Sequence, residues 1–156
     1  MSKHRYLALQ IFAKFLSAAT ASKLYVRGLT LRVLLRSKIH RAYITECNEN
    51  YVGSILIDQA LMERVDLWQY EKVLVCDITN GNRFETYAIA GEKGSGVVSV
   101  QGAAAKLVDK GDCVIIMSFE VTENPITPKM ILVNEDNEFV EYLGAKHYAR
   151  QLHAAK

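Results

Sequence analysis

The sequence predicts a mainly-β fold, a single closed barrel with few and short helices. The chain has 156 residues, of which 50% are apolar and 23% charged, enough for one compact core. From residue 31 onward it divides into short runs rich in β-branched and aromatic residues, which are typical of strands. Because closing a sheet into a barrel removes its exposed edges, a series of such strands within one domain favours a barrel.

The predicted strands are separated by residues that favour turns. Asn80-Gly81 lies between two runs, and this dipeptide is a strong signal for a hairpin of antiparallel strands. Gly91, Gly94 and Gly96 loosen the next connection. The strands are predicted over residues 31–35, 41–45, 73–79, 83–89, 97–101, 113–121 and 130–134.

Two short helices complete the predicted domain. Residues 59–65 follow Asp58, whose carboxylate can cap the first turn of a helix. The residues of this helix that would face the core are Leu61, Met62 and Val65. A second helix is predicted in the polar tail at residues 144–155. We therefore expect a barrel domain over residues 31–143, followed by a C-terminal tail over residues 144–156.

Residues 1–30 differ from the rest of the chain. Nine of the 19 Lys and Arg residues fall in residues 1–45, which contain no acid, whereas residues 46–156 hold ten basic and 17 acidic residues. The basic residues are singly spaced and lack interleaved aromatics, so nucleic-acid binding is disfavoured. Lys14 splits the apolar stretch into two runs, each shorter than the ~20 residues that span a bilayer. A targeting peptide, a genuine extension and a misassigned start all stay open, and we expect residues 1–30 to be dispensable.

Generic motifs assign no chemistry to the chain. Cys47, Cys76 and Cys113 form no CxxC pair, and their odd number favours a reducing compartment over a disulfide framework. The four His residues lack the spacing of zinc ligands, so we expect no metal site. The sequence contains no Gly-rich phosphate loop and no HExxH motif. Composition and these motifs lead no further than a β-barrel domain.

Four segments carry a more specific signal. They are SKIHRA at residues 37–42, YVGSILID at 51–58, TNGNRFETYAI at 79–89 and GAAA at 102–105. In this order and spacing they closely resemble the pyruvoyl-dependent aspartate 1-decarboxylases, over roughly residues 31–143. The resemblance implies a double-psi β-barrel that converts L-aspartate to β-alanine and CO2 for pantothenate synthesis. It also implies a cytoplasmic homotetramer with active sites between subunits, and no nucleic-acid or membrane partner.

The resemblance further implies that the chain cleaves itself between Gly53 and Ser54, although a Gly-Ser pair is otherwise an ordinary turn. Gly53 has no side chain, so the Ser54 hydroxyl can approach the carbonyl before it. Attack would give an ester, elimination would leave dehydroalanine, and hydrolysis would produce a covalent pyruvoyl group from Ser54, on the second of two chains. That group would form a Schiff base with the substrate amine and serve as an electron sink.

Roles for other residues follow from the same resemblance. Arg83 would offer a bidentate fork and Lys38 a point charge to the substrate carboxylates. Tyr87 would donate a proton to the substrate carbon. Thr86 would hydrogen-bond the Gly53 carbonyl during cleavage and later contact substrate. Backbone N–H groups that would bind substrate belong to Gly102, Ala103 and Ala104. Without the resemblance, these would be ordinary strand residues and the start of a helix.

Several positions leave alternatives open. Gln101 stands where the family usually has Asn, and its extra methylene moves the amide. Cys76 lies where some members have an aromatic residue, and we expect it to be a small buried apolar residue. His40 and Tyr51 match positions near the family's active site, but a packing role is equally compatible with them. The rival functions are a non-catalytic binding or regulatory barrel and a decarboxylase for another amino acid.

Overall fold

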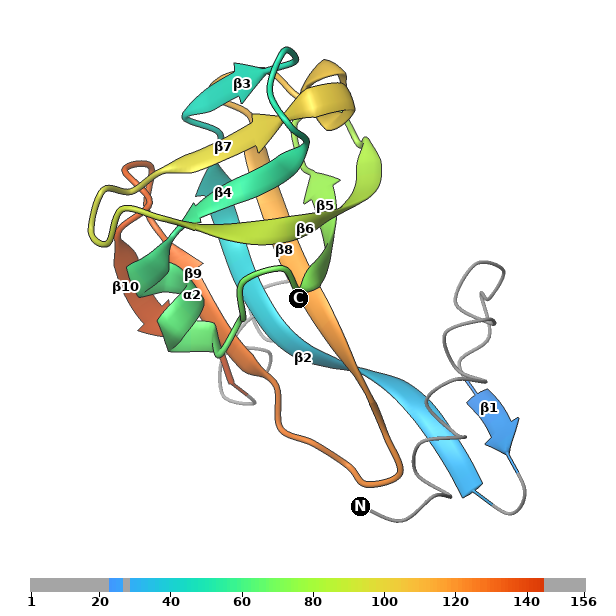
Figure 1. Ribbon diagram of the computed structural model, residues 1–156. Helices are drawn as coiled ribbons and strands as arrows, with labels where there is room; N and C mark the ends of the chain where they lie inside the picture. The colour runs from blue at the N-terminus through green and yellow to red at the C-terminus, as the bar shows by residue number, and fades with distance from the viewer. Residues whose placement is uncertain (1–22, 27–28, 145–156) are drawn as a thin grey trace, which may run out of the picture. The chain divides into compact units, whose positions relative to one another are not determined.

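The computed structural model describes residues 23–26 and 29–144, and expectations for residues 1–22, 27–28 and 145–156 lie outside these ranges. Figure 1 shows a fold built mainly of strands, as the sequence predicts. The elements in chain order are β1 (Lys23–Val26), β2 (Leu29–Tyr43), β3 (Glu46–Asn48), β4 (Ser54–Asp58), α2 (Gln59–Val65), β5 (Lys72–Asp77), β6 (Arg83–Gly91), β7 (Val98–Gln101), the 3-10 helix η1 (Gly102–Lys106), β8 (Cys113–Thr122), β9 (Lys129–Val133) and β10 (Phe139–Tyr142).

The strands form one mixed sheet. Its order is β10-β9-β2-β8-β5-β6-β4-β7-β3, and β1 pairs with β2. The pairs β2–β9, β3–β7 and β4–β6 are parallel, whereas β4–β7, β5–β6 and β5–β8 are antiparallel. Parallel neighbours require a long crossover, and the chain between β4 and β6 supplies one that contains α2 and β5. The mixed pairing brings strands from different parts of the sequence together.

The chain divides into two compact units. The larger unit contains residues 35–119 and, as far as the structure describes the tail, 127–144. The described part of the smaller unit comprises β1, the start of β2 and residues 120–126. Within the smaller unit, β1 pairs antiparallel with β2, so that Val26 faces Leu29 and Lys23 faces Arg32.

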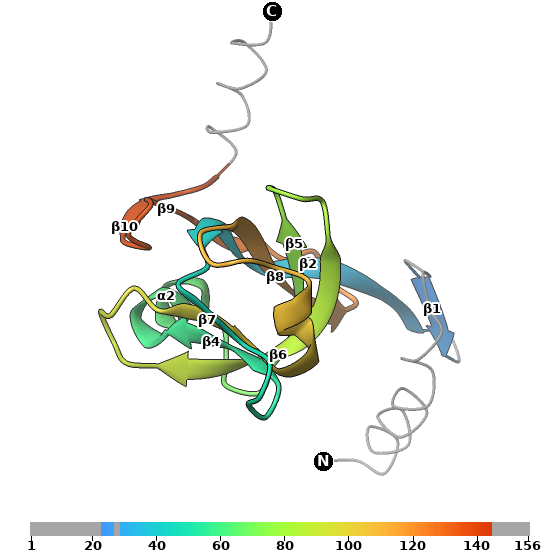
Figure 2. The same cartoon turned by 90° about the horizontal axis from the view of Figure 1, so that it is seen from above.

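The larger unit holds the hydrophobic core. In Figure 2, β4, β5, β6 and β7 of this unit lie around a common interior. Side chains from these strands and from β8 fill it, and those that are fully buried include Ile55, Ile57, Val73, Val75, Val98, Val100, Val114 and Ile116. Burying branched side chains on the inner face of each strand is the main favourable contribution to folding. A mainly-β, barrel-like fold is thereby confirmed.

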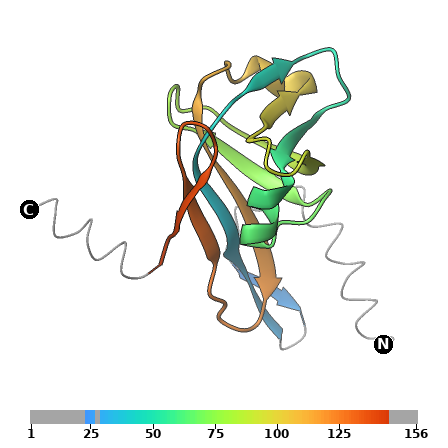
Figure 3. The ribbon, with the colours of Figure 1, turned by 90° about the vertical axis from the view of Figure 1, so that its left-hand side faces the viewer.

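Helix α2 forms as predicted and follows directly on the end of β4 (Figure 3). Asp58 caps the helix, since its Oδ1 accepts the Ala60 N–H at 2.7 Å. The three predicted core residues of this helix are all buried, namely Leu61, Met62 and Val65. Asp66 then ends the helix in the left-handed conformation, with φ 56°. No helix among residues 23–26 and 29–144 is long and apolar enough to cross a membrane.

Local signals located most strands, but two predictions about strands were wrong. Residues 31–35 and 41–45 were expected as separate strands, whereas β2 runs without a break from Leu29 to Tyr43. Pairing with β9 and β8 holds the polar middle of β2 extended, although that segment lacks a strand pattern of its own. The prediction also missed β1, β3, β4 and β10, which have three to five residues each.

Candidate active site

Ser54 is the first residue of β4 and follows an exposed loop. Its side chain is buried, with an exposed fraction of 3%, whereas the preceding Tyr51 and Val52 are 59% and 79% exposed. Gly53, between Val52 and Ser54, is half-buried. The Gly53–Ser54 peptide therefore lies where an exposed loop enters a buried strand. Exposed chain on one side gives it room to rearrange, and a paired strand on the other side holds it in place.

Gln101 and Gly102 lie directly opposite this peptide. Antiparallel pairing of β4 with β7 places Gln101 across from Ser54. The Ser54 hydroxyl donates a hydrogen bond to Gln101 Oε1, with 3.4 Å between the oxygens. Gly102 has φ +70°, and a Cβ added to it would lie 2.6 Å from the Gly53 Cα. Such a distance is shorter than real Cβ contacts, so the two glycine backbones meet directly.

Thr86 and Tyr87 lie on β6, on the other side of β4. The parallel register pairs Ile55 with Ala88. Continued one and two residues toward the start of β4, that register brings Ser54 level with Tyr87 and Gly53 level with Thr86. Thr86 is half-buried and Tyr87 is 37% exposed. Both residues thus lie at the same height of the sheet as the Gly53–Ser54 peptide.

Arg83 is the first residue of β6 and follows the Asn80-Gly81 turn. The antiparallel pairing of β5 with β6 confirms the predicted hairpin, and Gly81 has φ +81°. The side-chain amide of Asn82 donates to the Leu107 carbonyl at 2.8 Å, and that of Asn80 donates to the same carbonyl at 3.3 Å. The hairpin that carries Arg83 is therefore fastened to the end of η1. Because Arg83 is exposed, its guanidinium group can contact an anion from solution.

Lys38 lies in the middle of β2, opposite Met130 of β9. Its side chain is half-buried, and this burial lowers the pKa of the ammonium group. Next to it, the Ser37 hydroxyl donates to the Val65 carbonyl at 2.7 Å. In the order of the sheet, β8, β5 and β6 lie between β2 and β4, so pairing does not place Lys38 beside Ser54.

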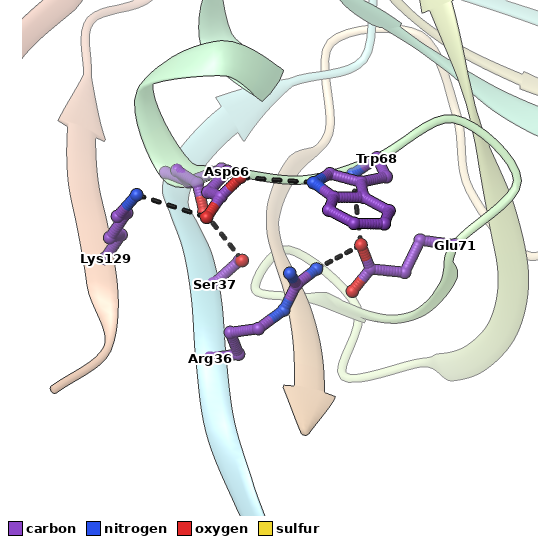
Figure 4. Close-up of polar contacts among 7 residues, drawn as sticks. Arg36, Ser37, Asp66, Trp68, Glu71 and Lys129 are labelled. Carbon is purple, nitrogen blue, oxygen red and sulfur yellow. Dashed lines mark hydrogen bonds and ion pairs between the residues drawn. The ribbon is translucent and has the colours of Figure 1, made fainter. Parts of the chain in front are cut away.

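Ion pairs and hydrogen bonds connect β2, the strand that carries Lys38, to neighbouring parts of the chain (Figure 4). Arg36 forms an ion pair with Glu71, whose Oε2 also accepts the Trp68 backbone N–H at 3.0 Å. The Trp68 indole donates to Asp66 at 3.1 Å, and Lys129 pairs with the other oxygen of Asp66 at 3.1 Å. These contacts tie β2 and the first residue of β9 to the connection between α2 and β5.

The sequence-predicted site residues thus fall into groups. Gly53, Ser54 and Gly102 are in contact or adjacent, and Thr86 and Tyr87 are level with them on the next strand. Ala103 is exposed and Ala104 half-buried on η1. Arg83 and Lys38 lie elsewhere on the surface of the same unit, and His40 is half-buried on β2.

The structure adds two residues and corrects one. Asn82 and Leu107 join the hairpin to η1, and sequence reasoning gave neither a role because their contact spans 25 residues. An Asn next to a hairpin turn is the only local signal for such an anchor. Cys76 was expected to be buried, but it is half-buried on β5 opposite Arg83. It lies near the end of β5, and its cross-strand neighbour Arg83 is exposed.

Comparison with known proteins decides the family. A model of the family described as aspartate decarboxylase matches residues 30–140. The chain belongs to the aspartate decarboxylase family. It is accordingly an enzyme of the carboxy-lyase class.

Relatives of this aspartate decarboxylase family member include three bacterial proteins named aspartate 1-decarboxylase. The protein from Clostridium botulinum (strain Loch Maree / Type A3) is 55% identical over 108 residues, which cover 67% of this chain and 85% of the relative. The protein from Acetivibrio thermocellus is 50% identical over 111 residues, 69% of this chain and 88% of the relative. That from Staphylococcus aureus (strain JH9) is 48% identical over 120 residues, 74% of this chain and 94% of the relative.

Proposed function

We propose that this chain is a pyruvoyl-dependent enzyme that converts L-aspartate to β-alanine and CO2, which feeds pantothenate synthesis. The observation that carries the proposal is the placement of the Gly53–Ser54 peptide. Ser54 is buried at the start of a strand and hydrogen-bonded to Gln101. The backbone of Gly53 lies directly against that of Gly102, with no Cβ between them. The names of the relatives support aspartate as the substrate.

Self-cleavage would proceed in three balanced steps. The Ser54 oxygen attacks the Gly53 carbonyl carbon, the peptide C–N bond breaks, and the hydroxyl proton goes to the released nitrogen, which leaves an ester. Loss of the Ser54 Cα proton then breaks the Cβ–O bond, frees the Gly53 carboxylate and produces dehydroalanine. Water then hydrolyses this residue: its nitrogen leaves as ammonia, the oxygen of water takes its place, and a ketone remains at residue 54. No external oxidant or reductant is needed.

The residues around position 54 fit a group of that size and chemistry. A pyruvoyl group supplies a ketone conjugated to an amide, which can bind an amine and accept the electrons left when CO2 departs. Position 54 is buried, and the neighbouring Gln101 amide can hydrogen-bond an oxygen there. Tyr87, level with residue 54, is suited to hold a proton for the substrate carbon.

Cationic side chains would bind the two carboxylates of the substrate. The Arg83 guanidinium can form two parallel hydrogen bonds to one carboxylate. Lys38, whose ammonium is partly desolvated, would attract an anion more strongly than a fully hydrated lysine. Thr86 would serve twice, first at the Gly53 carbonyl and then at the substrate. Backbone N–H groups at Gly102, Ala103 and Ala104 would bind the substrate from η1.

A homotetramer with active sites between subunits is part of the proposal. Large apolar side chains are exposed beside the candidate cleavage site, and Val52 and Tyr51 are 79% and 59% exposed in the single chain. Assembly would cover surface of this kind. The three free thiols, Cys47, Cys76 and Cys113, suit a reducing compartment such as the cytoplasm.

Intact mass spectrometry of purified protein tests the proposal. We expect two fragments that divide between residues 53 and 54, with the second lighter by one ammonia than a fragment that begins with serine. Ser54→Ala should stay as one chain and be inactive, because alanine has no oxygen for the acyl shift. Ser99→Ala is a matched control, since Ser99 is also a buried serine, on β7.

The measurements also separate the rival functions. An intact wild-type chain that binds ligands without turnover would replace the proposal with a non-catalytic barrel. Cleavage with turnover of a different amino acid in a substrate panel would retain the pyruvoyl chemistry but not the substrate. Cleavage of Ser54→Ala at the wild-type rate would exclude Ser54 as the nucleophile.

A further inference from the structure

We propose that Gln101 and Gly102 are positioning residues for self-cleavage and hold the Gly53–Ser54 peptide in its reactive geometry. The proposal rests on the proposed function, because it concerns the same bond. Both residues would act before any substrate is bound. Gly102 would contribute through the absence of a Cβ, which lets Gly53 approach closely, in addition to the backbone N–H group proposed to bind substrate.

The Gln101 side chain is directed at the serine and not at the helix that follows. Gln101 occupies the N-cap position of η1, yet its side chain makes no capping hydrogen bond there. Its Oε1 instead accepts the Ser54 hydroxyl. Pairing of β4 with β7 fixes the two backbones opposite each other, so the side chain needs to span only a short gap. The amide fixes the direction of the O–H bond.

That direction matters for the attack on the carbonyl. An amide oxygen is too weak a base to remove the hydroxyl proton, so Gln101 contributes orientation. With the hydrogen engaged by Oε1, the rotation of the hydroxyl is restricted, and a lone pair can be held toward the neighbouring carbonyl. Because Ser54 is 3% exposed, few water molecules compete for this hydroxyl. Loss of one such hydrogen bond corresponds to a change of roughly tenfold in rate.

Gly102 supports the other residue of the peptide. A Cβ on Gly102 would lie 2.6 Å from Gly53 Cα, 3.0 Å from Gly53 N and 3.3 Å from the Tyr51 carbonyl oxygen. A Cβ on Gly53 would meet Gln101 O at 3.6 Å and Gly102 Cα at 4.0 Å, which are ordinary contacts. The requirement for a bare backbone is therefore stricter at position 102 than at position 53.

The first experiment compares two glycine variants. Gly102→Ala must displace Gly53, and we expect self-cleavage to slow by roughly a hundredfold, as small misplacements of reacting groups do. Gly111→Ala is the matched control, because Gly111 has φ +94° and nothing lies within 4 Å of an added Cβ. It imposes similar backbone strain away from the peptide, and we expect normal cleavage. Thermal unfolding of both full-length proteins compares their stability.

The second experiment compares three variants of Gln101. Gln101→Met keeps the approximate length of the side chain without the acceptor, and we expect cleavage to slow roughly tenfold. Gln101→Glu keeps an oxygen at the same position and should restore cleavage. Should Gln101→Met fail to fold, Gln101→Ala removes the acceptor with a smaller side chain and makes the same comparison.

Hydroxylamine separates positioning from a later defect, because it cleaves an accumulated ester. If Gly102→Ala and Gln101→Met impair the acyl shift, hydroxylamine will not restore fragments at the wild-type rate. Variants that cleave like wild type, equal slowing in Gly111→Ala, or rapid hydroxylamine cleavage of the slow variants would each overturn the proposal. If wild-type protein itself shows no break between residues 53 and 54, the proposed function fails instead.

Discussion

The Asp58 carboxylate, at the end of β4, accepts the backbone N–H of Gly96 at 2.8 Å across 38 residues of sequence. Its other oxygen accepts the N–H groups of Ala60 at 2.7 Å and Gly94 at 2.9 Å. One buried side chain thus caps α2 and also holds the loop between β6 and β7. The strand that begins with Ser54 is therefore fixed at its far end by three hydrogen bonds to one carboxylate.

Asp58→Ala should destabilise the domain by about 2–4 kcal/mol, because it removes a buried carboxylate that accepts three backbone N–H groups. Asp58→Asn should cost less, since one oxygen remains to accept. Urea unfolding of full-length protein measures the change. Asp136→Ala, which alters an exposed aspartate, is the control. Equal stability of the Asp58→Ala and control proteins would contradict the dual role of this carboxylate.

Tyr87→Phe should still cleave at Gly53 but lose most decarboxylation. The phenol is proposed to act on the substrate carbon, and removal of a general acid costs about 10²–10⁴-fold in rate. Intact mass reports cleavage, and release of CO2 from aspartate reports turnover. Tyr70→Phe removes the hydroxyl of a tyrosine that is 70% exposed and should leave both unchanged. Normal turnover by Tyr87→Phe would remove this residue from the site.

Arg83→Lys should weaken aspartate binding, because an ammonium cannot form the two parallel hydrogen bonds of a guanidinium. We expect a loss of about 1.5–3 kcal/mol, the usual value of a hydrogen bond to a charged group. Steady-state kinetics would show it as a raised KM for aspartate. Arg32→Lys, on an exposed residue of β2, is the control. An unchanged KM would place the carboxylate elsewhere.

Asp77→Asn should stabilise the protein at neutral pH by about 1 kcal/mol. Burial, and next the neighbouring Asp112 carboxyl, raise the pKa of Asp77, while the N–H groups of Thr79 and Asn80 oppose the shift. Cys113 also lies near Asp77, and burial together with the Asp77 carboxylate raises the pKa of the Cys113 thiol. Asparagine retains an acceptor for the Thr79 N–H, which now lies 2.7 Å from Asp77 Oδ1, and removes the like charge.

The stability gained by Asp77→Asn should depend on pH, because the raised pKa of Asp77 sets the pH range in which its charge is present. A carboxyl whose pKa is higher in the folded state binds a proton more readily when folded. Its contribution to stability is therefore full below the unfolded pKa and is lost as the pH rises through the folded pKa. The advantage of Asp77→Asn should shrink as the pH is lowered toward about 4, the ordinary range of an aspartate. Thermal unfolding between acid and neutral pH measures this, and a difference independent of pH would contradict it.

Elements that depend on local chemistry could be predicted from the order of residues alone. Asn80-Gly81 favours a hairpin wherever it stands, and β5 and β6 pair across it. Asp58 caps a helix because its carboxylate reaches the N–H group two residues ahead. The four segments that resemble the aspartate decarboxylases also identified the family, since a family pattern is read from residue order alone.

Features that depend on partners distant in the sequence became apparent only in the folded chain. β4 has five residues without alternation, and it is a strand because β6 and β7 pair with both of its edges. The polar middle of β2 is extended because β9 lies beside it. The contact of Gly53 with Gly102 joins residues 49 positions apart, and no local preference encodes it. Such contacts arise only when packing brings distant backbones together, which is why the geometry around Ser54 required the folded chain.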